Sequence, residues 1–432
     1  MLERLGEMER RWVVGLGFKA EPGAVALIPS QEGGIARVLT GIRRDEPVWA
    51  LGGLPETLPP GVYALAGNPG PAIASRYALG WALGAYEFSR YKPRRREPAQ
   101  LVWPAAVNRA EVERLASAIH LARDLINTPA EDMGPAHLAA SVQEVAAKAG
   151  ARFSVIEGEA LLKQNYPTIH AVGRASSRPP LLIDLVWGDA HAPKVTLVGK
   201  GVCFDSGGLD LKTASGMQMM KKDMGGAATL IGLASAIMDA GLPVRLRLLV
   251  PAVENSVSAN ALRPLDVIRT RKGITVEIGN TDAEGRLILC DALAEADSEN
   301  PALLIDVATL TGAARAALGP DLPALFTPDD ALAELLLATG RAESDPLWRL
   351  PLWRPYRKMI DSKVADISNS GDSPFAGAIT AALYLAEFVS PATKWAHIDS
   401  YAWNAKPRPG RPEGGEALTL RALYAAIKTR FG

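Results

Sequence analysis

Two patterns of apolar and polar positions alternate along most of this chain. Short β-branched or leucine-rich runs predict strands, several of them apolar enough to be buried on both faces. These runs lie at 181–187, 194–204, 244–253, 303–310 and 394–399. Between them, apolar residues recur at helical spacing and predict helices at 225–241, 287–299 and 378–389. This alternation predicts an α/β fold in which helices flank a mostly parallel central sheet.

The first hundred or so residues differ from the rest, because they are rich in glycine and proline between short apolar runs. We predict a small N-terminal α/β domain over residues 1–107. Leu115, Ile119, Ala122 and Ile126 then recur at helical spacing until the Asn-Thr-Pro stretch at 127–129, which should end a helix. We therefore expect a linker helix over 108–127 and a large C-terminal domain over 128–432.

Composition narrows the classes of function. The chain has 432 residues, with Lys+Arg and Asp+Glu equal at 47 each. This balance disfavours binding to nucleic acid or to an anionic membrane. The basic stretch RYKPRRREP (90–98) leaves a local nucleic-acid-binding patch as an alternative. The charged start MLERLGEMERRWVV does not read as a signal peptide, and no apolar run is long enough to span a bilayer. We expect a cytoplasmic protein without a membrane partner.

Cysteines and histidines limit the chemistry. The two cysteines, Cys203 and Cys290, cannot form a disulfide framework and are interpreted as buried thiols. The five histidines are scattered, with none of the close spacings of histidine-based zinc sites. A metal in this protein would therefore need mostly oxygen ligands.

Charged residues follow the predicted strands. Lys200, Asp205 and Lys212 come after the apolar run KVTLV (194–198), and Asp223 stands directly before a Gly-Gly helix start. The stretch GNTDAEGRLILCDAL (279–293) adds Asp282 and Glu284. In open α/β sheets ligands bind beyond the carboxyl ends of strands. Carboxylates gathered there repel one another unless a cation lies among them, and two divalent ions about 3.5–4 Å apart would suit hydrolysis.

Each residue also has an ordinary structural interpretation. Asp223 could favour a helix N-terminus, Asp282 could cap the following helix, and Arg286 could be a surface ion-pair partner. Met220 and its neighbouring methionines could be core filler. Gly285 is interpreted as freeing the backbone to turn between Glu284 and the helix. Their combination, rather than any one of them, favours a metal site.

At this point the sequence resembles the leucyl aminopeptidase (cytosol aminopeptidase) family of two-metal exopeptidases. The resemblance is carried by VGKGVCFDSGG, Lys212, MKKDMGGAA and above all NTDAEGRL, the signature of that family. It runs in register from ARDLINTP (122–129) to the C-terminus and is faint before residue 100.

The resemblance implies a metal-ligand set. Asp205 and Glu284 would bridge two divalent ions, Lys200 and Asp223 would complete the tighter site, and Asp282 would complete the more exchangeable one. Lys200 would ligate as the neutral amine, so metal affinity should fall in acid. Zn²⁺ or Mn²⁺ come first among the expected ions, with Mg²⁺ and Co²⁺ as alternatives.

The resemblance also implies the catalytic groups. A metal-bound hydroxide would attack the peptide carbonyl, with Lys212 as the electrophile that donates to the oxyanion. Arg286 would hold a bicarbonate that relays the proton. The exchangeable ion would bind the free α-amine of the substrate, which makes the activity that of an exopeptidase on small peptides.

Family positions imply the substrate pocket and the assembly. Met220, Thr309 and Gly312 would line the pocket for the first side chain, and the backbone of Leu310 would accept from the substrate. The chain departs from the family at SYAWNAKPRPGRPEGGE (400–416), which should form part of the pocket wall and leaves the side-chain preference open. Family members are homohexamers, and we expect the same here.

Other functions remain as alternatives on the sequence alone. A dipeptidase, such as one acting on Cys-Gly, and a DNA-binding member of the family are close variants. A two-metal phosphoesterase would use the same carboxylates, but the additional Arg or His donors that phosphate sites favour are not found.

Overall fold

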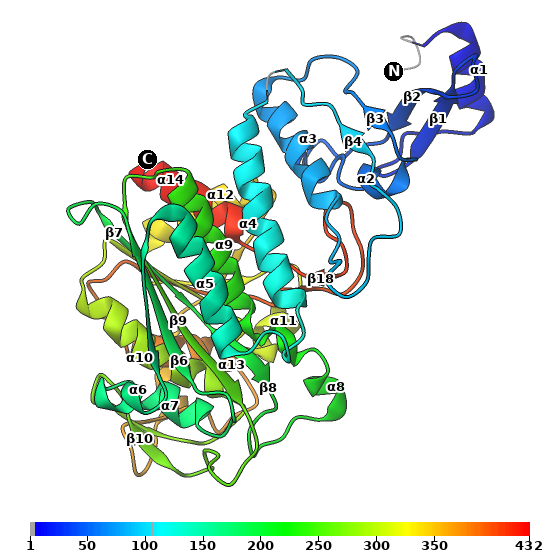
Figure 1. Cartoon of the computed structure of the whole chain (residues 1–432). Coiled ribbons are helices and arrows are strands. Elements are labelled where there is room, and N and C mark those ends of the chain that lie inside the picture. Colours follow the sequence, from blue (N-terminus) through cyan, green and yellow to red (C-terminus); the bar gives the residue numbers. More distant parts are fainter. Residues whose placement is uncertain (1–4, 106) are drawn as a thin grey trace. The chain divides into compact units, whose positions relative to one another are not determined.

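The computed structural model describes residues 5–105 and 107–432. The chain forms two compact units (Figure 1), and each is described by itself. Unit 1 comprises Met1–Ala116 together with Lys406–Glu413, and unit 2 comprises Ser117–Ala405 together with Gly414–Gly432. The division falls inside helix α4 (Arg109–Asn127), which ends where the Asn-Thr-Pro stretch predicts.

Unit 1 is a small α/β unit, as the sequence predicts. It contains an antiparallel strand pair and a short parallel pair, with three helices before α4 in the described residues: β1 (Val25–Pro29), β2 (Ile35–Thr40), β3 (Val62–Tyr63), β4 (Gln100–Leu101), α1 (Glu7–Gly15), α2 (Leu54–Thr57) and α3 (Pro71–Gly84). One of its apolar clusters gathers around Trp81, whose indole N–H donates to the carbonyl of Ala99 at 2.9 Å.

A nine-stranded sheet forms the centre of unit 2 in the described chain. Its order is β14-β13-β16-β12-β7-β9-β6-β5, with β8 paired to β9. The strands are β5 (Arg152–Glu157), β6 (Leu181–Trp187), β7 (Lys194–Gly199), β8 (Gly201–Asp205), β9 (Arg245–Asn255), β12 (Leu303–Ala308), β13 (Ala324–Phe326), β14 (Trp348–Arg349) and β16 (Trp395–Asp399). Strands β16, β12, β7, β9 and β8 run parallel, and antiparallel pairs occur on either side of them.

Helices cover both faces of this sheet (Figure 1). Helices α5 and α9 pack on one face, and α7, α10 and α13 join the apolar cluster on the other. The helices and 3-10 turns of unit 2 after α4 are α5 (Pro135–Ala149), α6 (Glu159–Lys163), α7 (Pro167–Gly173), α8 (Ala214–Met217), η2 (Met220–Met224), α9 (Gly225–Asp239), α10 (Glu284–Ser298), α11 (Gly312–Leu318), α12 (Asp330–Ala342), η3 (Arg354–Ile360), α13 (Gly377–Ala386) and α14 (Leu420–Phe431).

Five short strands complete unit 2. They are β10 (Val267–Arg269), β11 (Thr275–Glu277) and β15 (Ile367–Ser368), which form one small sheet, and β17 (Trp403–Asn404) and β18 (Gly414–Gly415), which pair with each other. No helix within the described ranges is both long and apolar enough to cross a membrane.

The predicted strand over 194–204 is wrong as a single element. It is interrupted at Lys200, which separates β7 from β8. The backbone of Lys200 donates to the carbonyl of Val307 on one side, and its own carbonyl accepts from Ala227 N on the other, each at 3.0 Å. The break changes the course of the chain from β7, between β12 and β9, to β8, which pairs farther along β9. Apolar content alone could not reveal this break, because the residues on both sides of it are buried.

The parallel strands bring chain segments far apart in sequence to one edge of the sheet. Strand β7 ends just before Lys200, β8 ends at Asp205, β12 ends just before Thr309, and β16 ends at Asp399. Carboxyl ends of adjacent parallel strands meet at the same edge, where α/β proteins bind ligands. This edge holds the candidate site.

Candidate active site

One cavity of unit 2 collects all of the residues singled out from the sequence. It has a volume of about 670 Å³, and its lining includes every one of the eleven candidates: Lys200, Asp205, Lys212, Met220, Asp223, Asp282, Glu284, Arg286, Thr309, Leu310 and Gly312. The sequence predicts their proximity, and the structure places them together.

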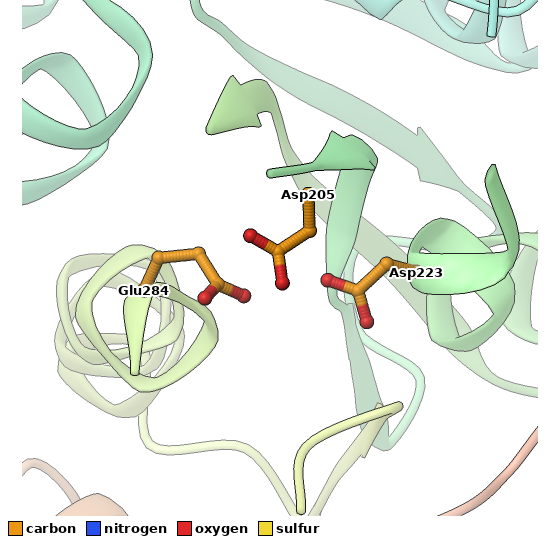
Figure 2. A group of neighbouring side chains, drawn as sticks. All are labelled: Asp205, Asp223 and Glu284. Carbon is orange, nitrogen blue, oxygen red and sulfur yellow. The ribbon is translucent and has the colours of Figure 1, made fainter. Parts of the chain in front are cut away.

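Three buried carboxylates form the centre of the site (Figure 2). Asp205 comes from the end of β8, Asp223 from the 3-10 turn η2, and Glu284 from the first turn of α10. Each offers an oxygen within 4.8 Å of the others, and each residue is at most 3% exposed. Like charges at this separation in a buried place are costly unless cations compensate them.

Lys200 lies against two of these carboxylates. Its Nζ is 2.7 Å from Asp223 Oδ2 and 2.9 Å from Glu284 Oε1, and it donates to the carbonyl of Thr309 at 2.8 Å. Burial alone would lower the pKa of Lys200, but the carboxylates of Asp223 and Glu284 outweigh burial and raise it. Without a metal, Lys200 is therefore the ammonium ion that neutralises the cluster.

Lys212 joins the third carboxylate to Asp282. Its Nζ is 2.8 Å from Asp205 Oδ2 and 2.5 Å from Asp282 Oδ1. Burial lowers the pKa of Lys212, but the charge and hydrogen bond of Asp205 outweigh it, so the pKa is raised. Lys212 is less buried than Lys200, and it therefore lies between the acidic cluster and the open cavity.

The cluster is short of positive charge. Four carboxylates share two lysines within ion-pair distance. Burial, followed by repulsion from Asp205, raises the pKa of Glu284 to about 8 and also raises the pKa of Asp282. The Oε2 atom of Glu284 is buried with no hydrogen-bond partner. An oxygen-rich, electron-rich group with an unpartnered carboxylate oxygen fits hard divalent cations.

The sequence-based interpretation of Gly285 is wrong. Gly285 is not a flexible turn residue but the second residue of α10, because the helix starts three residues earlier than predicted. A Cβ at this position would lie 2.6 Å from Cε and 2.8 Å from Nζ of Lys200. Glycine is needed here because the helix leaves room for the lysine stem. Asp282 does not cap this helix either, since Ala283 occupies the N-cap position.

Arg286 is held apart from the carboxylates. Among the described residues it has no ion pair within 4.0 Å, and its Nη1 donates to the carbonyl of Asn369 at 2.7 Å. The side chain is buried and lines the cavity, and its Nε has no hydrogen-bond partner. Burial lowers the pKa of Arg286. The guanidinium is a buried cation that an anion in the cavity could satisfy.

The opposite wall comes from the segments after β12 and β16. Thr309 Oγ1 donates to Asp223 Oδ1 at 2.8 Å, which orients that carboxylate. The backbone N–H groups of Leu310 and Thr311 donate to Asp399 Oδ1 and hold the turn that leads to Gly312. Of the divergent stretch 400–416, Ser400 and Tyr401 line the cavity, whereas Trp403 does not and 406–413 belongs to unit 1.

Two asparagines that sequence reasoning missed position the site. Asn255 Nδ2 donates to Asp205 Oδ1 at 2.8 Å and to the carbonyl of Thr281 at 3.1 Å. Asn369 Oδ1 accepts from the N–H of Gly279 and of Asn280, and its Nδ2 donates to the carbonyl of Asn280. They hold Asp205 and the loop that carries Asp282. Neither asparagine stands in a motif, so no local signal could have identified it.

The fold and the acidic site fit a metal-dependent enzyme, and comparison with known proteins identifies the class as peptide hydrolases that act as exopeptidases. Residues 120–424 match the profile described as "Cytosol aminopeptidase family, catalytic domain", and residues 2–104 match "M17 aminopeptidase, N-terminal domain". The chain belongs to the cytosol aminopeptidase family. The match over the N-terminal residues is clearer than the faint resemblance of the sequence there suggests.

Individual relatives agree over nearly the whole chain. A probable cytosol aminopeptidase of Syntrophotalea carbinolica is 40% identical over 436 residues, covering 96% of this chain and 85% of the relative. The crystal structure of the cytosol aminopeptidase from Coxiella burnetii superposes with a TM-score of 0.96 at 52% identity, covering 100% of this chain and 94% of that one. The bottromycin maturation enzyme BotP in complex with Mn has a TM-score of 0.89 at 36% identity, covering 99% and 97%.

Proposed function

We propose that this chain is a two-metal aminopeptidase that removes the N-terminal residue from short peptides. The observation that carries the proposal is the buried group of Asp205, Asp223 and Glu284 at the carboxyl ends of parallel strands, with Lys200 among them. A structural salt-bridge cluster would pair its charges, whereas this cluster retains excess negative charge and an unpartnered oxygen of Glu284.

Five side chains would hold the ions. They are Lys200, Asp205, Asp223, Asp282 and Glu284. Lys200 must lose its proton to ligate, and this proton loss couples metal binding to pH. Two bound divalent ions would supply Lewis acidity and lower the pKa of a water for attack on the peptide carbonyl. Zn²⁺ and Mn²⁺ are the proposed ions, and the manganese complex of BotP supports the second.

The remaining residues bind and polarise the substrate. Once ions engage Asp205 and Asp282, the ammonium of Lys212 is free to donate to the oxyanion that develops on the carbonyl oxygen. Arg286 would hold a bicarbonate, which would supply a proton relay when bound. Met220, Thr309 and Gly312 would surround the first side chain, and the Leu310 carbonyl would accept from the substrate, since its N–H is already used by Asp399.

Two further expectations belong to this proposal. The family resemblance supports a homohexamer, and the names of the related cytosol aminopeptidases support a cytosolic location.

The test is hydrolysis of a panel of amino-acid amides by metal-stripped protein, with each divalent ion added back separately. We expect no turnover without metal and restoration by Mn²⁺ or Zn²⁺. The variant Glu284→Gln should bind fewer ions per chain and lose activity. Absence of turnover with every ion, or full activity in Glu284→Gln, would contradict the proposal.

A second variant separates metal binding from catalysis. Lys212→Ala should keep its metal content and lose about 10²–10³ in kcat, the usual loss when an oxyanion donor is removed. Lys148→Ala, which removes an exposed lysine of α5, is the matched control and should behave as the unmodified protein. Loss of metal from Lys212→Ala would show that its role is misassigned.

A further inference from the structure

Two cations lie near one aromatic ring in the cavity wall. The Nζ of Lys222 lies 4.6 Å from the ring centroid of Tyr401, and the guanidinium carbon of Arg315 lies 4.9 Å from the same centroid. The three residues come from different elements: η2, α11 and the loop after β16. All three line the candidate active-site cavity. Both positive charges therefore lie within cation–π distance of the same ring.

Neither cation has an anionic partner in the protein. In the part of the chain that the structure describes, no carboxylate lies within 4.0 Å of Lys222 or Arg315, although Lys222 is only 5% exposed. The carboxylates nearby, Asp223 and Asp399, already have other partners. Asp223 pairs with Lys200, and Asp399 accepts from the backbone of Leu310 and from the N–H and hydroxyl of Thr311. Lys222 is a buried cation without a counter-charge, which is costly, and an anionic ligand would compensate it. Arg315 is exposed and adds a second positive charge at the same ring.

The position of the cations indicates which part of a substrate they would meet. Met220 and Gly312 are the proposed walls of the pocket for the first side chain. Lys222 and Arg315 line the same cavity as these two residues. Arg315 lies one helical turn after Gly312 in α11, so the two residues share a face of that helix. We therefore assign the two cations to that pocket.

We infer that Lys222 and Arg315 select peptides whose first residue carries a carboxylate side chain, aspartate or glutamate. This inference rests on the proposed function and adds its substrate class. The carboxylate would ion-pair with both cations, with the planar guanidinium offering paired donors and the ammonium a point charge. Tyr401 keeps the cations in place through its ring. An uncharged amide side chain of the same size would leave Lys222 without its counter-charge, and a lysine or arginine would be repelled.

The experiment compares isosteric substrates that differ only in side-chain charge. Metal-loaded protein is assayed with glutamyl and glutaminyl α-amides, and with aspartyl and asparaginyl α-amides, none of which has a free C-terminal carboxylate. We expect kcat/KM to favour the acidic member of each pair by at least about tenfold, the usual value of a hydrogen-bonded charge. The leucyl amide serves as the uncharged reference.

Variants assign the preference to the cluster. Lys222→Met and Arg315→Met should each reduce the glutamyl-to-glutaminyl ratio by about tenfold, with metal content measured in parallel because Lys222 adjoins Asp223. Arg315→Met is the cleaner variant, because Arg315 stands on a different element from every proposed ligand. The control Lys148→Met removes an exposed positive charge of unit 2 and should keep the original ratio.

Several results would overturn the inference. One is a ratio near or below one in the unmodified protein, and another is a preference that survives in both variants. A third is a preference for a free C-terminal carboxylate in place of a side-chain carboxylate. In that case Leu-Gly would be cleaved faster than Leu-Gly amide, and glutamyl and glutaminyl substrates would be cleaved equally fast. Turnover of leucyl amide together with any of these leaves the proposed function intact.

If no amide is hydrolysed with any ion, the proposed function fails. The side-chain preference is then decided by calorimetric binding of L-glutamate against L-glutamine. Equal binding would also refute the inference.

Discussion

Glu284 shows at the level of one residue how burial and charge prepare the site for a metal. It lies in the first turn of α10 with one oxygen on Lys200 and the other unpartnered. Burial and the neighbouring Asp205 raise its pKa from 4.5 to about 8. Without a metal the native protein therefore favours a protonated Glu284 at neutral pH, and a divalent ion must displace that proton.

This raised pKa predicts a pH-dependent stability of the metal-free protein. Because the folded pKa lies above the unfolded value, protonation stabilises the native state fully below pH 4.5, and this stabilisation is lost as the pH rises through about 8. We expect the free energy of unfolding, measured with urea, to fall between about pH 6 and about pH 8.5. Glu284→Gln cannot ionise and should show a shallower fall. Equal slopes in the two proteins would contradict the assignment.

At the level of elements, helix α10 packs against Lys200 at the break between β7 and β8. The helix must approach the lysine stem closely, and Gly285 permits this because a Cβ there would lie 2.6 Å from Cε of Lys200. The strand predicted over 194–204 is divided in two at Lys200, and the helix predicted from residue 287 begins three residues earlier. Lys200 lies outside the ladder, and α10 starts at Glu284.

The variant Gly285→Ala tests this packing. Alanine in a helix is ordinarily more stable than glycine by about 0.5–1 kcal/mol. Here we expect instead a loss of about 1–3 kcal/mol in the free energy of unfolding from overpacking, together with fewer metal ions bound per chain. Gly15→Ala in α1 is the control, because no atom lies within 4 Å of its added Cβ. A stabilised, fully metal-loaded Gly285→Ala would show that the close approach is unimportant.

At the scale of the whole molecule, a segment near the C-terminus belongs to the N-terminal unit. Lys406–Glu413 clusters with unit 1, where the guanidinium of Arg411 stacks 4.4 Å from the ring centroid of Trp49. Gly410 has a φ of +71°, and a Cβ there would lie 2.7 Å from the same ring. The stretch 400–416, where the sequence departs from the family, therefore contributes to both units. Tyr401 lines the candidate active-site cavity of unit 2, and Gly410 packs on Trp49 in unit 1.

Gly410→Ala should destabilise unit 1 without changing metal content. The left-handed backbone and the clash with Trp49 together should cost about 2–4 kcal/mol. Faster hydrogen exchange of peptides around Trp49, with ions per chain unchanged, is the expected observation. Gly33→Ala shares the positive φ but has open space, so it isolates the backbone cost of about 1–2 kcal/mol. Equal effects of the two variants would show that the contact with Trp49 adds nothing.

Much of the site could be predicted because its residues stand in short local motifs. Asp282 and Glu284 lie two residues apart at a helix start, and Lys200 and Asp205 lie within and just after the strand predicted over 194–204. Since parallel strands end at a common edge, their meeting also follows from the strand–helix alternation. Asn255 and Asn369 could not be predicted, because each is a single amide whose partners lie in segments far away along the chain.

The sequence by itself determined the α/β class, the catalytic family resemblance and the set of charged residues, because periodicity and local motifs depend on neighbouring positions. Tertiary structure alone decided the role of Gly285, the break at Lys200 and the pairing of Lys222 and Arg315 across Tyr401. These features are distances between side chains from separate elements. Packing decides such distances, and no pattern of neighbouring residues records them.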